Sequence, residues 1–194
     1  MKYSIELSYK TPKEWADQVI ENMDSFLQDH ADCERKASAM AMNFVAKCPD
    51  KVEIIPELIE TALEELEHFQ MVYQVMEKRG VKLMDKMPKD QYIQDLMGLC
   101  RSSTEERLMD RMLIASIVEC RGAERFRLIA EALEESEMKK FYKMLWTSEA
   151  KHGNIYVEMA LNYWPEKEVY ARLHELNAAE GEICAKLQWR PALH

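Results

Sequence analysis

Two short stretches of the sequence decide how this chain folds. Glu65–His68 reads Glu-Leu-Glu-His, and Glu149–His152 reads Glu-Ala-Lys-His. They are the only places in the sequence where a glutamate precedes a histidine by three residues. Residues three apart lie on the same face of a helix, so each stretch can offer a carboxylate and an imidazole to one metal ion. A single stretch of this kind is usually an exposed pair, and the surrounding sequence must decide.

Apolar residues recur with helical spacing through four long segments, and one glutamate continues each apolar stripe. For example, Met112, Ala115 and Phe126 share a predicted face with Glu119. The four glutamates are Glu34, Glu65, Glu119 and Glu149. An unpaired carboxylate in a protein core costs several kcal/mol, so four inward glutamates require a compensating charge.

The spacing of these glutamates repeats along the chain. Glu65 follows Glu34 by 31 residues, and Glu149 follows Glu119 by 30. One glutamate from each of two helices, with Glu-x-x-His from each of the other two, is the ligand set of ferritin-like di-iron and di-manganese proteins. The predicted ligands are therefore Glu34, Glu65, His68, Glu119, Glu149 and His152. Four carboxylates balance two divalent ions, and mixed oxygen and imidazole ligands suit iron or manganese better than metals that prefer thiolate. We expect two iron ions rather than manganese.

Other acidic and histidine residues are weaker candidates as ligands. Glu64, Glu67 and Glu124 lie off the apolar stripes and are expected to be exposed. His30 precedes Glu34 by one helical turn, which suits either a core histidine or a group supporting that ligand. We expect the two remaining histidines, His174 and His194, at the surface.

The pattern predicts an all-α, ferritin-like four-helix bundle in one domain over residues 1–194. Pro49, Gly80 and Pro165 mark helix ends. A long crossover joins helices 2 and 3, and an additional helix follows the bundle. The expected ranges are 12–48, 54–78, 104–133 and 137–163 for the bundle, 90–99 for a short helix inside the crossover at 81–103, and 166–187 for the C-terminal helix.

Composition excludes several classes of protein. The five cysteines are odd in number and form no Cys-x-x-Cys pair, which argues against a disulfide framework and an iron–sulfur cluster. The sequence has no run of 18 apolar residues and no apolar leader at its start, so we expect no membrane span and a cytoplasmic location.

The sequence resembles the tRNA 2-methylthio-N(6)-isopentenyladenosine hydroxylases, the MiaE family. The resemblance spans all four bundle helices and is most specific at Cys33–Lys36 (Cys-Glu-Arg-Lys) and Glu124–Phe126 (Glu-Arg-Phe). It implies a di-iron monooxygenase that uses dioxygen to hydroxylate the isopentenyl group beside the tRNA anticodon. By position, the six predicted ligands take the family's di-iron roles.

The partners implied are tRNA and an electron donor. Six of the ten arginines fall within residues 101–127, and the pairs Arg107/Arg111 and Arg121/Arg125 place like charges one turn apart, which an anionic RNA would offset. Nearby acidic residues and the net charge of −9 weigh against an RNA-binding face.

The sequence has neither a Gly-x-Gly-x-x-Gly motif nor a cysteine cluster, so electrons would come from a separate reductase or ferredoxin.

The ligand pattern alone leaves two other functions open, because a fold and its ligands do not choose a reaction. One is a rubrerythrin-like peroxidase or manganese catalase, which needs no RNA. The other is a ferritin-like protein that oxidises and stores iron inside a shell-forming oligomer.

Overall fold

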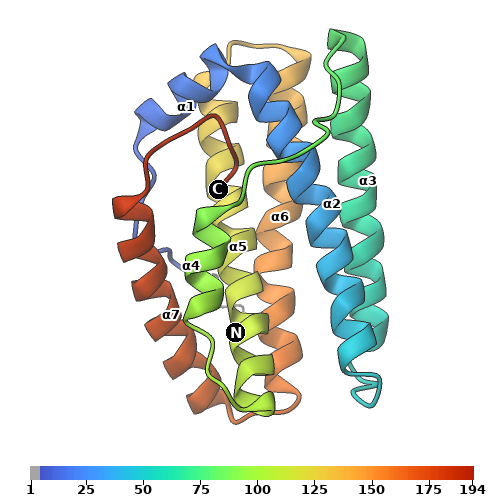
Figure 1. Ribbon diagram of the computed structural model, residues 1–194, viewed down its shortest axis with the longest axis vertical. Helices are drawn as coiled ribbons and strands as arrows, with labels where there is room; N and C mark the ends of the chain where they lie inside the picture. The colour runs from blue at the N-terminus through green and yellow to red at the C-terminus, as the bar shows by residue number, and fades with distance from the viewer. Residues whose placement is uncertain (1–4) are drawn as a thin grey trace. The chain divides into compact units, whose positions relative to one another are not determined.

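The computed structural model of the protein describes residues 5–194, so the first four residues of the stretch searched for a leader lie outside it. The described residues form helices and no strands (Figure 1). The helices are α1 (Lys13–Glu21), α2 (Met23–Lys47), α3 (Ile55–Arg79), α4 (Gln91–Gly98), α5 (Thr104–Ala132), α6 (Glu137–Leu161) and α7 (Glu166–Lys186). Within these residues, every helix is too short or too polar to cross a bilayer.

The chain divides into two compact units. Residues 18–89 and 190–193 form one unit, called here the α2–α3 unit, and the described residues 5–17, 90–189 and 194 form the other, called the α5–α6 unit. Each unit contains one of the two Glu-x-x-His stretches.

In the α2–α3 unit, two long helices pack along their length and run antiparallel (Figure 1). The Ser38 hydroxyl donates to the carbonyl of Ala62 at 2.8 Å, which fixes their register. Pro56 lies in the first turn of α3, where its missing N–H is tolerated. Gly80 ends α3 in the left-handed region at φ 72°, as the sequence predicted.

In the α5–α6 unit, α5 and α6 form the central pair, α7 packs on both, and α4 contacts α5 and α7. Serine caps begin both central helices. The hydroxyl of Ser103 accepts from the backbone N–H of Glu106, and that of Ser136 accepts from Lys139 at 3.2 Å. These caps satisfy amide groups that have no partner inside the helix.

The predicted first helix, 12–48, is wrong in one respect: it is two helices separated by Asn22. Asn22 has φ −124° and ψ 36°, and its side-chain amide donates to the carbonyl of Gln18 at 2.9 Å. Asparagine competes for backbone groups in this way and therefore interrupts helices. The other predicted helices agree with the structure to within two residues at each end.

Candidate metal centre

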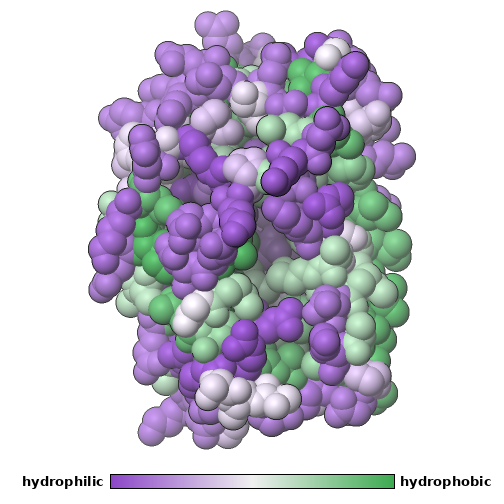
Figure 2. All heavy atoms as spheres, in the orientation of Figure 1, coloured by the Kyte–Doolittle hydropathy of each residue, from purple (hydrophilic) through white to green (hydrophobic). Residues whose placement is uncertain are grey.

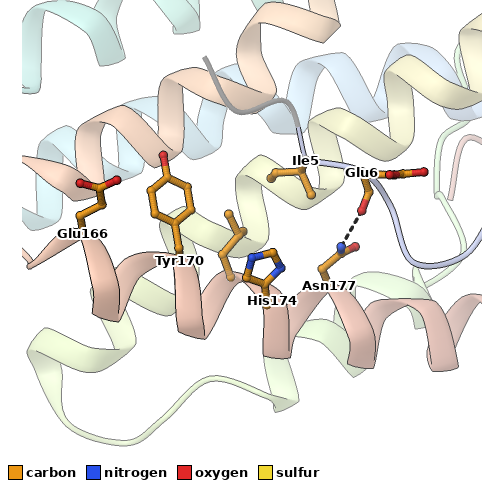
Figure 3. Close-up of a pocket in the computed structure, with 7 residues that line it drawn as sticks. Ile5, Glu6, Glu166, Tyr170, His174 and Asn177 are labelled. Carbon is orange, nitrogen blue, oxygen red and sulfur yellow. Dashed lines mark hydrogen bonds between the residues drawn. The ribbon is translucent and has the colours of Figure 1, made fainter. Parts of the chain in front are cut away.

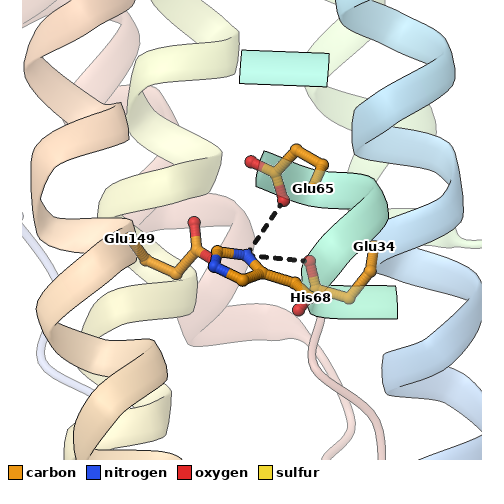
Figure 4. A group of neighbouring side chains, drawn as sticks. All are labelled: Glu34, Glu65, His68 and Glu149. Atoms are coloured by element: carbon orange, nitrogen blue, oxygen red, sulfur yellow. Dashed lines mark ion pairs between the residues drawn. The ribbon is translucent and has the colours of Figure 1, made fainter. Parts of the chain in front are cut away.

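The α2–α3 unit brings three predicted ligands together, and we call them the first half-site. Glu34 comes from α2, and Glu65 and His68 come from α3; all three are buried. Figure 4 shows the His68 ring facing both carboxylates, with its Nδ1 3.5 Å from Glu65 Oε2 and 3.9 Å from Glu34 Oε2. One ligand atom from each residue lies within 4.8 Å of the others, so all three can reach one ion.

A further histidine, His30, contacts a carboxylate of the first half-site. His30 is fully buried, and its Nε2 lies 2.6 Å from Glu34 Oε1. Its ring packs against Phe26, with centroids 5.7 Å apart. The sequence left two roles open for His30, and the structure combines them. His30 is a core histidine, and it hydrogen-bonds the carboxylate of a predicted ligand, Glu34.

The α5–α6 unit brings together the other three predicted ligands, and we call them the second half-site. Glu119 comes from α5, and Glu149 and His152 come from α6; all are buried. His152 Nδ1 lies 3.0 Å from Glu149 Oε2. One ligand atom from each residue again lies within 4.8 Å of the others, so this unit repeats the donor set of the first half-site.

A close approach of α5 and α6 lies directly beside the second half-site. The hydroxyl of Ser116 donates to the carbonyl of Gly153, and a Cβ at position 153 would overlap the sulfur of Cys120. Gly153 follows His152, and Cys120 follows Glu119, so the contact joins the two ligand-bearing turns. Burial, reinforced by the Glu119 charge, raises the pKa of Cys120 to about 12, so this thiol stays neutral. This contact was not predicted from the sequence, in which the glycine adjoining His152 is the only local signal of it.

A buried ion pair connects α5 to α7. Arg121 is inaccessible to solvent, and its Nε and Nη2 each donate to a different oxygen of Glu180 at 2.8 Å. The hydroxyl of Tyr92 on α4 donates to the same carboxylate at 3.0 Å. Burial by itself would raise the pKa of Glu180, but the hydrogen bonds and charge of Arg121 outweigh it and lower the pKa, so Glu180 stays ionised.

The prediction that Arg121 and Arg125 face RNA is wrong, because both are buried. Glu180 offsets the charge of Arg121, and the guanidinium of Arg125 lies over the Trp15 ring, 5.1 Å from its centroid. Burial also lowers the pKa of Arg125. The other predicted arginines, Arg107 and Arg111, are exposed and half-buried, respectively, so their contact with RNA remains a prediction.

The alternative ligands are not part of either half-site. Glu64 and Glu67 are exposed, as expected. Glu124 is half-buried and accepts from the backbone N–H of Thr11 at 3.0 Å and from its hydroxyl at 2.7 Å. Glu124 therefore ties the N-terminal segment to α5.

Neither of the two remaining histidines belongs to a potential metal-binding group among the described residues. The ring of His194 stacks on Tyr92 with centroids 5.0 Å apart and is half-buried, whereas we expected it at the surface. His174 is exposed, as expected, and lines a surface pocket of about 400 Å³ with Tyr170 and Asn177 (Figure 3). The amide of Asn177 donates to the Glu6 carbonyl at 2.9 Å across this pocket. None of the potential metal-binding groups among residues 5–194 includes a residue of the pocket.

Comparison with known proteins agrees with this geometry. The model of the tRNA-(MS[2]IO[6]A)-hydroxylase (MiaE) family matches residues 2–194. The chain belongs to the MiaE family. A Pseudomonas putida member named tRNA 2-(methylsulfanyl)-N(6)-isopentenyladenosine(37) hydroxylase is 32% identical over 91% of this chain and 85% of its own length. A member of the same name from Salmonella typhimurium is 24% identical over 89% of this chain and 81% of its own length.

A solved structure shares the fold of this MiaE-family chain. It is named as protein 43 with aldehyde deformylating oxygenase activity from Synechococcus, and it is 30% identical, with a TM-score of 0.91 over 98% of this chain and 96% of its own. The predicted all-α, ferritin-like fold is confirmed by this likeness and by the helices of the described residues.

Proposed function

We propose that this protein is a di-iron tRNA hydroxylase whose two half-sites together hold two iron ions. The observation that supports the proposal is that each unit buries the same donor set, one glutamate and one Glu-x-x-His pair. The six ligands would be Glu34, Glu65, His68, Glu119, Glu149 and His152.

The residues present fit two divalent ions. Four carboxylates carry four negative charges, and neutral imidazoles complete the donor set without adding charge. Carboxylate oxygen and imidazole nitrogen suit iron, whereas thiolate-binding metals would require ionised sulfur. The nearby thiol of Cys120 is held neutral by burial and is not a candidate ligand.

We propose that the substrate is the one in the names of the two relatives, the isopentenyl group of 2-(methylsulfanyl)-N(6)-isopentenyladenosine in tRNA. Bound iron would activate dioxygen, which does not attack a C–H bond unaided. One oxygen atom enters the side chain, and the other leaves as water after two electrons and two protons are added. The electrons would come from a separate reductase or ferredoxin, and the enzyme would work in the cytoplasm, where tRNA is used.

The protein's own part in this reaction is to hold the ligands and exclude water. His30 orients Glu34 through the 2.6 Å hydrogen bond to Oε1, and Oε2 of the same carboxylate lies on the side of His68, 3.9 Å from its Nδ1. The contact of Ser116 with Gly153 joins the helices that carry Glu119 and His152. Apolar burial around both half-sites keeps their carboxylates from bulk water.

The peroxidase and iron-storage alternatives are not favoured, because the matching family and both relatives are named for tRNA hydroxylation. The deciding test supplies the reduced, iron-loaded protein with isopentenylated tRNA, an electron donor and labelled dioxygen. We expect one labelled oxygen atom in the modified nucleoside by mass spectrometry, and none with the Glu65→Ala variant. Unmodified tRNA together with fast peroxide consumption would overturn the hydroxylase proposal.

We further propose that Arg107 and Arg111 at the start of α5 contact tRNA phosphates, since arginine suits phosphate. The double variant Arg107→Glu/Arg111→Glu should bind tRNA more weakly, with a flatter dependence on salt, and should keep its iron. Lys186→Glu, an exposed change on α7, is the matched control. If the double variant and the control bind tRNA with equal affinity at low salt, Arg107 and Arg111 do not contact the tRNA phosphates.

A further inference from the structure

The end of α3 and the crossover that follows it form the most basic stretch of an acidic chain. Residues 78–89 contain five cations and one carboxylate, whereas the whole chain has a net charge of −9. No other stretch of twelve residues has more than two cations in excess of its carboxylates. We call residues 78–89 the basic segment. Its cations are all exposed, and they are Lys78, Arg79, Lys82, Lys86 and Lys89.

Two of the five cations already have a role inside the protein. The guanidinium of Arg79 pairs with the carboxylate of Asp24 on α2 at 2.7 Å. Lys78 lies in the last turn of α3, where a positive charge complements the helix dipole. The other three cations follow the end of α3; we call them the crossover lysines, and they are Lys82, Lys86 and Lys89.

The crossover lysines have no carboxylate to neutralise them. Among residues 5–194, no carboxylate oxygen lies within 4.0 Å of any of their ammonium groups. Lysines on the helices often do have such a partner: Lys36 pairs with Asp32 at 2.6 Å, and Lys140 pairs with Glu137 at 2.8 Å. The crossover therefore concentrates positive charge that the protein itself does not use, and an external anion can bind it.

The basic segment is held against the helix that carries Glu34. The side-chain amide of Gln28 on α2 donates to the carbonyl of Lys82 at 2.7 Å, and the backbone N–H of Val81 donates to the carbonyl of Met76 at 2.9 Å. Figure 1 shows the crossover leaving the end of α3 and passing over α2. Gln28 precedes Glu34 by six residues, about 9 Å along the helix axis. Measured along α2, the crossover begins within about two turns of the first half-site.

The crossover also exposes apolar side chains among its lysines. Leu83 and Met84 are each 45% exposed. Figure 2 shows hydrophobic atoms set among hydrophilic ones near the end of α3, where the crossover begins. Lysine suits phosphate, and exposed apolar side chains suit the faces of unstacked bases, so a single-stranded RNA loop matches both features. The turn at the opposite end of the unit, residues 48–54, has one cation and two carboxylates, and it offers no such match.

We propose that the basic segment binds the anticodon loop of the substrate tRNA. The crossover lysines contact its phosphates, and Leu83 and Met84 pack against its unstacked bases. This inference rests on the proposed function, in which the modified nucleoside belongs to tRNA and lies beside the anticodon.

The test measures how isopentenylated tRNA binds the iron-loaded protein over a range of salt concentrations. Replacing the three crossover lysines by glutamine should weaken binding by at least about tenfold at moderate salt. It should also lower the slope of log affinity against log salt by about two to three, because each phosphate contact releases about one counterion. The variant is Lys82→Gln/Lys86→Gln/Lys89→Gln.

A matched control removes the same net charge elsewhere. It changes three exposed lysines of other helices that also lack a carboxylate within 4.0 Å among the described residues. This variant should keep the wild-type salt slope, and it is Lys13→Gln/Lys47→Gln/Lys167→Gln. A third variant, Leu83→Ser/Met84→Ser, should bind more weakly with an unchanged slope, because it loses no charge. Iron content should stay at the wild-type value in all three variants, since none of them changes a predicted ligand.

The possible outcomes separate this inference from the proposed function. If the crossover-lysine variant binds tRNA as the control variant does, the basic segment is not the tRNA-binding surface, and the hydroxylase proposal stands. If the wild type does not bind tRNA, both proposals fail. If the crossover-lysine variant loses binding to phosphatidylserine vesicles while its tRNA affinity is unchanged, the segment binds a lipid surface and the inference is overturned.

Discussion

The first half-site, on α2 and α3, and the second half-site, on α5 and α6, each contain two glutamates and one histidine at nearly the same spacing, yet their surroundings differ. In the α2–α3 unit, His30 hydrogen-bonds Glu34 and the outer helix faces remain exposed. In the α5–α6 unit, α7 covers both helices and the buried pair of Arg121 and Glu180 ties it to α5. The ligand pattern is therefore symmetric, while the contacts that hold it are not, and the two half-sites should respond differently to mutation.

We expect the largest loss of stability when the buried ion pair of the α5–α6 unit is broken. Arg121→Met would leave Glu180 buried without its cation and should lower the free energy of unfolding by about 3–5 kcal/mol. Arg79→Met in the α2–α3 unit removes an exposed pair with Asp24 and should cost less than about 1 kcal/mol. Urea unfolding of the two variants makes the comparison. If both variants lose the same free energy of unfolding, the buried ion pair does not stabilise the α5–α6 unit more than an exposed pair would.

The second largest loss of stability is expected where α5 and α6 approach closely. Gly153→Ala would force a methyl group into the Cys120 sulfur and should destabilise the protein by about 1–3 kcal/mol. Cys120→Ala in the same chain should recover part of this loss, because it removes the overlapping atom. The unfolding free energies of the two single variants and the double variant measure this coupling.

Gly122 supplies the control for that prediction. It lies in α5, and a Cβ added there meets no atom within 4 Å. Gly122→Ala should therefore be neutral or stabilise the helix by up to about 1 kcal/mol. If Gly153→Ala changes the unfolding free energy no more than Gly122→Ala does, the packing of α5 on α6 does not require a glycine at position 153.

The last expected effect is on metal binding at the first half-site. His30→Ala should weaken metal binding there by about 10–100-fold, because the carboxylate of Glu34 loses the group that orients it. His30→Gln retains a donor and should recover part of the affinity. Metal titration followed by absorbance should show one weakened ion and one unchanged ion. Equal weakening of both ions would mean that His30 does not act on one half-site alone.

Local patterns predicted which buried glutamates and histidines each unit brings together, and most helix ends, because both depend on residues within a few turns of each other. Glu65 and His68 are one turn apart, and Ser103 caps the helix that begins next to it. The break at Asn22 was not predictable from periodicity, because apolar residues recur with helical spacing on both sides of it. The partner of Arg121 was missed because Glu180 lies 59 residues later, and a charge pattern on one helix does not show which distant carboxylate will neutralise it.

The most direct test of the central claim counts tightly bound metal ions per chain by elemental analysis after loading with ferrous iron. The account predicts two ions in the wild type and none in Glu65→Ala/Glu149→Ala, which removes one carboxylate from each half-site. The control variant Glu64→Ala/Glu67→Ala changes two exposed neighbours and should keep both ions. Two tightly held ions in Glu65→Ala/Glu149→Ala would contradict the assignment of these six residues as the ligands of a two-iron centre.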